Sequence, residues 1–308
     1  MAMHINRRDV LQGAIGLASL ALPPLVRAAR EAASAIEIND RLAAIAGVGG
    51  NVLALSGNDG LLLVDSGAPS SSDALQAQLR ALRGGDRVRT LFNTHGHIEQ
   101  TGSNEVFGRA GAKIVAHEKT KLRLATDHYI PQLDRYEKAR PKEAIPTEAF
   151  YDGGSAHFGD EQIEYGYLPE AHTAGDIYVF FKNSNVIAVG GALSPDRDPE
   201  FDWFAGGWIG GRIDALSLLL ELGDAQTRFV AASGPIVDRS QVQAERDMMQ
   251  LVYDRMADLV RKGYTTQDML QAGVTEKLGR TLNDPYRFLY DVHKGIWAHH
   301  NTLSHDVV

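Results

Sequence analysis

The chain has 308 residues, with 31 Lys and Arg against 39 Asp and Glu, a formal net charge of −8, and no cysteine. This length allows one large domain or two ordinary ones, and the 44% hydrophobic and 23% charged residues are typical of a folded globular protein. The acidic balance without a basic block argues against a nucleic-acid partner. The lack of cysteine excludes disulfides, thiolate nucleophiles and thiolate-bound metals, so any metal site must use histidines and carboxylates.

Residues 1–35 are predicted to be an export signal rather than part of the fold. Arg7 and Arg8 precede a mildly apolar stretch over residues 14–26, a pattern similar to a bacterial twin-arginine signal, which exports folded proteins to the periplasm. The stretch is short and is interrupted by Pro23 and Pro24, so we expect no stable membrane span after cleavage. A basic amphipathic helix is the alternative. Two small-residue junctions are candidate cleavage sites: residues 26–28 and 33–35.

Residues 36–116 alternate short apolar runs with turn signals. Strands are predicted over residues 42–45, 52–55, 61–64, 88–92 and 113–116. The run at 61–64 is apolar throughout, which indicates a strand covered on both faces. Polar residues 70–73 begin a helix in which Leu75, Leu79 and Leu82 share one face. Strand, helix and strand in this order form a βα unit.

The second half of residues 36–308 is expected to repeat this order, with strands followed by helices. Residues 127–152 are polar with little periodicity and are predicted to be a long loop, which in a compact domain is usually a functional lid or a mobile segment. Residues 158–168 read as a hairpin, and further strands are predicted at 177–181, 186–189 and 229–232. Helices are predicted at 213–222, at 241–262 and onward to about 302, in addition to a short helix at 103–107 between the strands of the first half. We therefore expect an α/β fold in one domain, residues 36–308, with two sheets flanked by helices.

The most informative segment reads THGHIEQTGSN and covers residues 94–104. His95 and His97 stand at the end of a predicted buried strand, where a turn can aim both imidazoles at one point. A third histidine, His172, lies in another turn before a strand, in the segment AHTAGD at 171–176. Neutral imidazole is a favoured zinc ligand, and three histidines leave one coordination position open for catalysis.

These segments resemble the metallo-β-lactamase superfamily, whose pattern is THxHxDHxGxN, then HTxGD, a strand with GD, and PGHG. The resemblance runs from about residue 36 to residue 301 and also includes residues 49–51, 62–67 and 114–118. It implies the αβ/βα four-layer sandwich, with metal at one end of the two sheets. It also implies that His95, His97 and His172 hold the first zinc ion.

The second metal site of the family is altered at four positions in this chain. Glu99 and Gln100 stand where the family has Asp and His, Gly191 stands at the bridging Asp, and Pro235 at the last His. Of these four, only Glu99 is a competent anionic ligand, and a lone carboxylate holds a divalent ion poorly. We therefore expect one zinc ion per chain.

The remaining motif residues have predicted roles around that ion. Glu99 is the candidate catalytic base, or alternatively a fourth ligand that closes the site. By the resemblance, Asp65 and Asp176 are buried carboxylates that orient the motif loops. Gln100 can exchange hydrogen bonds with substrate but is a poor zinc ligand.

Aromatic residues near Gly206 and Gly207 look like the pocket loop of one branch of the family. Trp203, Phe204 and Trp208 are therefore predicted to form an apolar substrate wall, and the alternative is that they pack the loop onto the fold. His117 follows a strand and is a candidate substrate contact, with a structural histidine as the alternative.

The sequence favours a periplasmic mononuclear zinc hydrolase that acts on an ester, lactone or amide bond of a small molecule. One alternative is a lyase or isomerase that uses zinc as a Lewis acid, and another is an inactive binding protein that keeps the pocket. The substrate and the oligomeric state are not readable from the sequence.

Overall fold

The computed structural model describes residues 32–85, 87–130 and 134–300. The chain divides into two units, Met1–Glu31 and Ala32–Val308, and all described residues belong to the second. The predicted export signal therefore lies outside the described residues except for its last four positions. Within the described part, no helix is both long and apolar enough to cross a membrane.

A seven-stranded sheet carries the first half of the fold, in the order β1-β2-β3-β4-β5-β6-β9. Strands β1 to β4 pair antiparallel, and β4, β5, β6 and β9 pair parallel. The bounds are β1 Ser34–Glu37, β2 Leu42–Ala46, β3 Val52–Gly57, β4 Gly60–Val64, β5 Val88–Phe92, β6 Lys113–His117 and β9 Glu148–Phe150.

A six-stranded sheet carries the second half, in the order β10-β11-β12-β13-β14-β15. Its only parallel pair joins β13 and β14; the others are antiparallel. The bounds are β10 Gly153–Phe158, β11 Glu161–Tyr167, β12 Ile177–Phe181, β13 Val186–Gly190, β14 Arg228–Ala231 and β15 Val237–Asp238.

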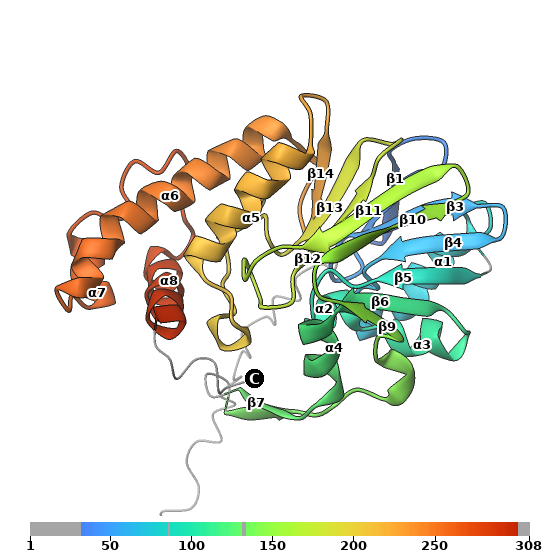
Figure 1. The fold of residues 1–308 in the computed structure, drawn as a ribbon, viewed down its shortest axis with the longest axis horizontal. Coiled ribbons are helices and arrows are strands. Elements are labelled where there is room, and N and C mark those ends of the chain that lie inside the picture. Colours follow the sequence, from blue (N-terminus) through green and yellow to red (C-terminus); the bar gives the residue numbers. More distant parts are fainter. Residues whose placement is uncertain (1–31, 86, 131–133, 301–308) are drawn as a thin grey trace, which may run out of the picture. The chain divides into compact units, whose positions relative to one another are not determined.

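Helices cover the outer faces of both sheets (Figure 1). The α-helices are α1 Ser72–Arg80, α2 Ile98–Thr101, α3 Asn104–Arg109, α4 Glu118–Ala125, α5 Ile209–Leu222, α6 Arg239–Arg261, α7 Thr266–Gln271 and α8 Pro285–His300. Short 3-10 helices lie at η1 Pro69–Ser71, η3 Lys142–Ala144 and η4 Trp203–Ala205, and β7 His128–Ile130 pairs with β8 Arg135–Glu137.

Strand β4 shows why the fold has four layers. Its apolar side chains alternate between two cores: Leu62 and Val64 pack against the second sheet, and Leu61 and Leu63 pack beneath α1 and α3. A strand buried on both faces needs apolar residues at every position, which is what its sequence provides. The predicted αβ/βα sandwich is confirmed by this arrangement.

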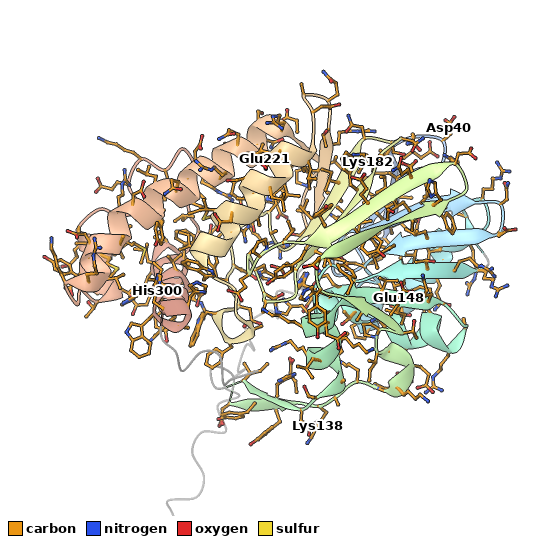
Figure 2. All side chains as sticks on the ribbon, viewed as in Figure 1. Asp40, Lys138, Glu148, Lys182, Glu221 and His300 are labelled. Atoms are coloured by element: carbon orange, nitrogen blue, oxygen red, sulfur yellow. The ribbon has the colours of Figure 1, made fainter. Side chains whose placement is uncertain are left out.

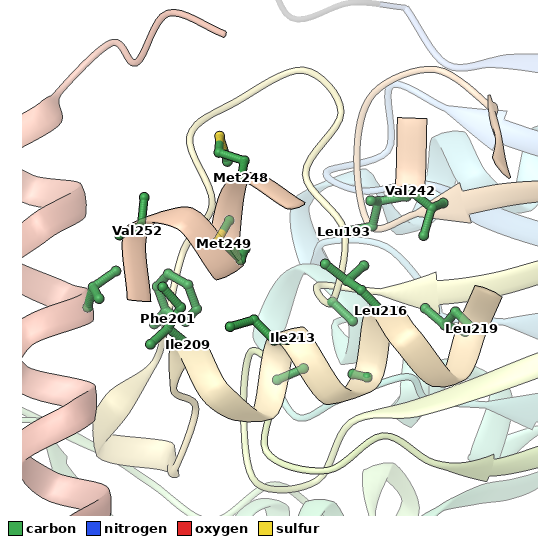
Figure 3. Close-up of a cluster of buried hydrophobic side chains, with 14 of the residues drawn as sticks. Leu193, Phe201, Ile209, Ile213, Leu216, Leu219, Val242, Met248, Met249 and Val252 are labelled. Atoms are coloured by element: carbon green, nitrogen blue, oxygen red, sulfur yellow. The ribbon is translucent and has the colours of Figure 1, made fainter. Parts of the chain in front are cut away.

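The largest core cluster lies on the outer face of the second sheet, under α5 to α8. Helix α6 places Met248, Met249 and Val252 over Ile213 and Leu216 of α5 (Figure 3). Charged side chains, including Asp40, Glu148 and Glu221, project outward from the ribbon (Figure 2). This packing fixes α5 between α6 and the second sheet.

The fold differs from the sequence predictions in three places. The segment 127–152, predicted to be one long loop, instead contains β7, β8 and η3, and its end forms β9, which pairs parallel with β6. Helix α4 follows β6 and was not predicted. Residues 272–284 are not α-helical, because the helical region predicted to run to residue 302 divides into α7 and α8.

Candidate metal centre

His95, His97 and His172 converge at one end of the two sheets. His95 and His97 lie in the turn between β5 and α2, and His172 lies in the loop between β11 and β12. Each offers a ring nitrogen within 4.8 Å of the other two, and their ring centroids are 4.8 to 4.9 Å apart. Of the described residues, these three form the group of His, Asp or Glu side chains that could hold a metal ion.

A hydrogen-bond chain from Asp65 fixes the ring of His95. The backbone N–H and the hydroxyl of Thr94 each donate to the Asp65 carboxylate at 2.7 Å. Because the Thr94 hydrogen is used in this way, His95 Nδ1, 3.0 Å away, must donate to Thr94 Oγ1. His95 Nε2 is therefore left with its lone pair toward the cluster.

Asp202 orients His97. Its Oδ2 lies 2.9 Å from His97 Nε2, which donates to the carboxylate and leaves Nδ1 as the free acceptor. Asp202 also accepts from the backbone N–H of Ala205, which caps η4, and its own N–H donates to the carbonyl of His172. Arg123 of α4 approaches the same carboxylate at 3.7 Å.

His172 is held by two other groups. Its Nδ1 lies 2.9 Å from the backbone carbonyl of Glu200, which can only accept, so Nδ1 carries the hydrogen and Nε2 has the lone pair. Asp176 accepts from the backbone N–H groups of His172 and Thr173 and from the Thr173 hydroxyl. Asp176 thus shapes the loop, as predicted from its position in the motif.

The three fixed rings leave three lone pairs facing a common point, which fits a zinc ion. Nδ1 of His97 and Nε2 of His172 are 3.1 Å apart, and two acceptors at this distance need a shared proton or a cation between them. The outer nitrogen of every ring is bound to an oxygen, the arrangement that orients histidine ligands in metalloproteins.

Burial and neighbouring charge set the ionisation of these groups. Burial and the other histidines lower the pKa of His95 well below its usual value and that of His172 to about 3. Burial also lowers the pKa of His97, but the hydrogen bond and charge of Asp202 outweigh burial and raise it. Burial raises the pKa of Asp202, and here too the His97 contact outweighs it, so that this pKa lies well below its ordinary value.

Replacing Asp202 with asparagine is expected to weaken zinc binding about 10- to 100-fold, because the carboxylate orients His97 and strengthens it as a ligand. Competition against a fluorescent chelator measures this affinity. Asp198→Asn is the control, since Asp198 lies in the same loop but accepts from the backbone of Asn283 and Asp284. An Asp202→Asn affinity within about twofold of the wild type contradicts this role.

The titration of Asp65 is expected to make the stability of the metal-free chain depend on pH. Burial raises the pKa of Asp65 to about 7, and the opposing hydrogen bonds from Thr94 offset only part of this rise. Between about pH 4 and pH 7 the folded chain therefore keeps a proton on Asp65 that the unfolded chain has lost. The stability that this proton contributes is complete below about pH 4 and is lost as the pH rises through about 7. We expect the unfolding free energy of the wild type, relative to Asp65→Asn, to fall between about pH 4 and pH 7 in urea titrations and to stay level above about pH 7. Asparagine suits the site because Asp65 has a left-handed φ of 65°. A difference that stays flat or rises with pH contradicts the assignment.

Glu99 and Gln100 lie in α2, directly after His97. Glu99 is exposed in the first turn of the helix and does not belong to the three-histidine group. Burial lowers the pKa of His97, Asp202 outweighs burial and raises it, and the charge of Glu99 adds a smaller increase. Gln100 is 4% exposed, its carbonyl accepts from the N–H of Ser66, and its side chain lies against Gly50.

Gly191 has no room for the bridging carboxylate that the family resemblance implies. A Cβ on Gly191 would stand 2.2 Å from Cδ2 of His172, a distance that no real contact tolerates. Pro235, at the position of the last family histidine, is exposed and has no ligating side chain. The position of the His172 ring therefore leaves no space for a carboxylate at residue 191.

The predicted aromatic wall divides in the structure. Trp203 and Phe204 are partly exposed in η4, directly after Asp202, with ring centroids 3.9 Å apart. Trp208 instead stacks on His299 of α8 at 3.7 Å and packs on the large core cluster. These contacts agree with the alternative interpretation, in which Trp208 packs the loop onto the fold.

His117 has a structural role rather than the predicted contact with substrate. Its Nδ1 accepts from the N–H of Lys119 and caps α4, and its Nε2 donates to the carbonyl of Tyr151. Its ring stacks on Tyr167 at 4.3 Å. Both ring nitrogens are thus used inside the fold, which leaves none for a ligand.

No sequence pattern identifies Asp202 and the carbonyl of Glu200 as hydrogen-bond partners of the histidines. Asp202 stands 105 residues from His97, and no local pattern links the two. Its one local sign is its position as an N-cap before Trp203, since aspartate is a favoured capping residue. The contact with His97 requires the tertiary fold.

Comparisons with known proteins agree with this geometry. A sequence model of the metallo-beta-lactamase superfamily matches residues 45–250, about two thirds of the chain. Metallo-beta-lactamase IND-1 of Chryseobacterium indologenes is 30% identical over 106 residues, which are 34% of this chain and 38% of that protein. The chain thus matches less than two thirds of the length of this relative.

Solved structures share the fold at low identity. A metallo-beta-lactamase from Pontibacter korlensis superimposes with a TM-score of 0.58 at 18% identity, over 71% of this chain and 99% of that one. A variant of the sec-alkyl sulfatase PisA1 gives a TM-score of 0.65 at 15% identity, over 85% of this chain and 50% of that one. With the histidine motif, the two-sheet sandwich and the family match in agreement, the chain belongs to the metallo-β-lactamase superfamily, whose members are typically metal-dependent hydrolases.

Proposed function

We propose that the protein is a mononuclear zinc hydrolase that acts on an ester, lactone or amide bond of a small molecule. The observation that carries the proposal is the convergence of three histidine nitrogens whose outer nitrogens are all bound to fixed oxygen atoms. The packing of His172 over Gly191 supports one ion rather than two, since a bridging carboxylate has no place there.

His95, His97 and His172 would hold the ion. Zinc in such a site supplies Lewis acidity, which polarises a carbonyl and makes water more acidic. Asp202, Thr94 and the Glu200 carbonyl keep the three rings oriented throughout turnover, so that no ring has to reorganise.

Glu99 is the proposed proton acceptor. It lies in the helical turn after His97, it is exposed, and it is free of the metal-ligand group. A carboxylate in this position takes the proton from the attacking water and returns it to the leaving group. Trp203 and Phe204 lie beside Asp202 on the opposite loop, where they would contact the apolar part of a substrate.

Export to the periplasm is part of the same proposal and rests on the twin-arginine pattern. Strand β1 begins at Ser34 and pairs with β2, and the carbonyl of Ala33 accepts from the Gln78 side chain. Cleavage near residue 28 would leave this strand whole, whereas cleavage near residue 35 would cut it. Sequencing the N-terminus of the exported protein separates the two junctions.

Metal content decides the proposal. Elemental mass spectrometry of the purified chain should find about one zinc per chain in the wild type and none in His172→Ala, which removes one of the three ligands. Two ions per chain would contradict the mononuclear site. No metal after reconstitution with zinc would favour the binding protein.

Hydrolysis itself is tested by turnover in ¹⁸O-water. A screen with chromogenic esters and lactones provides the substrate. Solvent oxygen in the product is expected from a hydrolase, whereas an unlabelled product would identify a lyase or isomerase.

A further inference from the structure

Arg212 is the largest fully buried side chain of the described residues, with 0% exposure. It projects from α5 and uses all three guanidinium nitrogens. Nε and Nη2 donate to Glu245 Oε1 at 3.0 and 2.6 Å, Nη2 also donates to the Ser194 hydroxyl, and Nη1 donates to the carbonyls of Gly191 and Glu200 at 3.0 and 3.4 Å. An arginine that is buried and fully bonded in this way is held in one conformation.

Two of those acceptors are the backbone groups on either side of His172. The Glu200 carbonyl also accepts from His172 Nδ1 at 2.9 Å. Gly191 lies directly under the His172 ring, so close that a Cβ there would meet Cδ2 at 2.2 Å. Arg212 Nη1 therefore bonds both the group that sets the tautomer of His172 and the residue on which its ring lies.

The counter-ion belongs to a different helix. Glu245 of α6 is 5% exposed, and its second oxygen accepts from the N–H of Ser194 at 3.0 Å. A buried ion pair is often no more stabilising than apolar residues of the same size, so stability alone does not account for its presence. The pair instead links the rigid α5–α6 layer to the loop that follows β13.

We propose that Arg212, with Glu245, is a positioning residue that fixes the ring and the tautomer of His172 so that its Nε2 faces the metal centre. The inference rests on the proposed function, because it concerns one of the proposed zinc ligands. It adds a distant helix to the parts of the fold that determine metal affinity.

The test compares two arginines that bond the same loop. In the double variant Arg212→Met with Glu245→Leu, both partners of the pair are replaced by apolar residues, which avoids leaving an unpaired buried charge. The matched control is Arg280→Met. Arg280 bonds the carbonyls of Ser194 and Arg197 in this loop and lies 3.8 Å from the second oxygen of Glu245, but it bonds neither Gly191 nor Glu200. Arg212→Lys is the second variant, because lysine keeps the charge but cannot bond several acceptors in one plane.

Two readouts separate positioning from structural support. Nitrogen-15 NMR of histidine-labelled, metal-free protein reports the tautomer of His172, and chelator competition reports zinc affinity. The double variant and Arg212→Lys should lose the single Nδ1–H tautomer and bind zinc about 10- to 100-fold more weakly. Arg280→Met should keep the tautomer and the affinity of the wild type.

The proposal is overturned if a folded Arg212 variant keeps both the tautomer and the affinity, or if Arg280→Met changes them equally. Should the double variant fail to fold, Arg212→Lys decides between these outcomes. A wild-type chain that binds no zinc would refute the proposed function, and the tautomer comparison would still decide the role of Arg212.

Discussion

Replacing Gly191 with alanine should abolish most zinc binding, with an affinity loss of at least about 100-fold. The new methyl group would stand 2.2 Å from His172 Cδ2 and 2.9 Å from its Nε2, so the ring must leave its place over the glycine. The Glu200 carbonyl then loses the ring that it orients. Two histidines in one turn are left, too few for a tight zinc site. Chelator competition and metal content measure the effect.

Gly191→Asp is a second test, for which the family pattern and the packing of His172 predict opposite results. The family pattern suggests that aspartate at this position would restore a second metal site, whereas the packing of His172 predicts that it removes the first. Gly96→Ala is the matched control, because a Cβ between His95 and His97 would meet Arg123 only at 3.5 Å or more, which is an ordinary contact. Tight zinc binding by Gly191→Ala, or two ions in Gly191→Asp, would show that the steric argument is wrong.

Replacing Glu99 with glutamine should lower the hydrolysis rate by about 100-fold or more and leave one zinc in place. Glutamine keeps the size of the side chain but cannot accept a proton at neutral pH, and general bases contribute about 10²- to 10⁴-fold. Zinc is retained because Glu99 lies outside the three-histidine group. The rate is measured at saturating chromogenic ester, together with metal content.

Glu118→Gln is the control for Glu99. Like Glu99, Glu118 stands in the first turn of a helix whose N-cap is a histidine, but that histidine, His117, is bonded within the fold. Its replacement should leave the rate unchanged. If Glu99→Gln hydrolyses the ester as fast as the wild type, then the proton goes elsewhere; if it loses the metal, Glu99 is a ligand.

The local pattern of the chain was sufficient to predict most of the fold. Apolar runs such as residues 61–64 predicted strands buried on both faces, and helical spacing placed Met248, Val252 and Met256 in the core. Such patterns depend on neighbours a few residues apart, so they can be read in one dimension. Strand β9 was missed because its three residues follow a polar segment, and only pairing with β6 makes them a strand.

For the site, the sequence by itself determined the donor types: no cysteine, three histidines in two turn motifs, and no carboxylate at position 191. Only the tertiary structure decided which nitrogens His97 and His172 present, because Asp202 and the Glu200 carbonyl reach these rings from distant parts of the chain, and Arg212 in turn bonds the Glu200 carbonyl. It also decided that both nitrogens of His117 are used within the fold. A hydrogen bond depends on the position of both partners to within a fraction of an ångström, and for partners far apart in sequence only the packed sheets and helices determine that position.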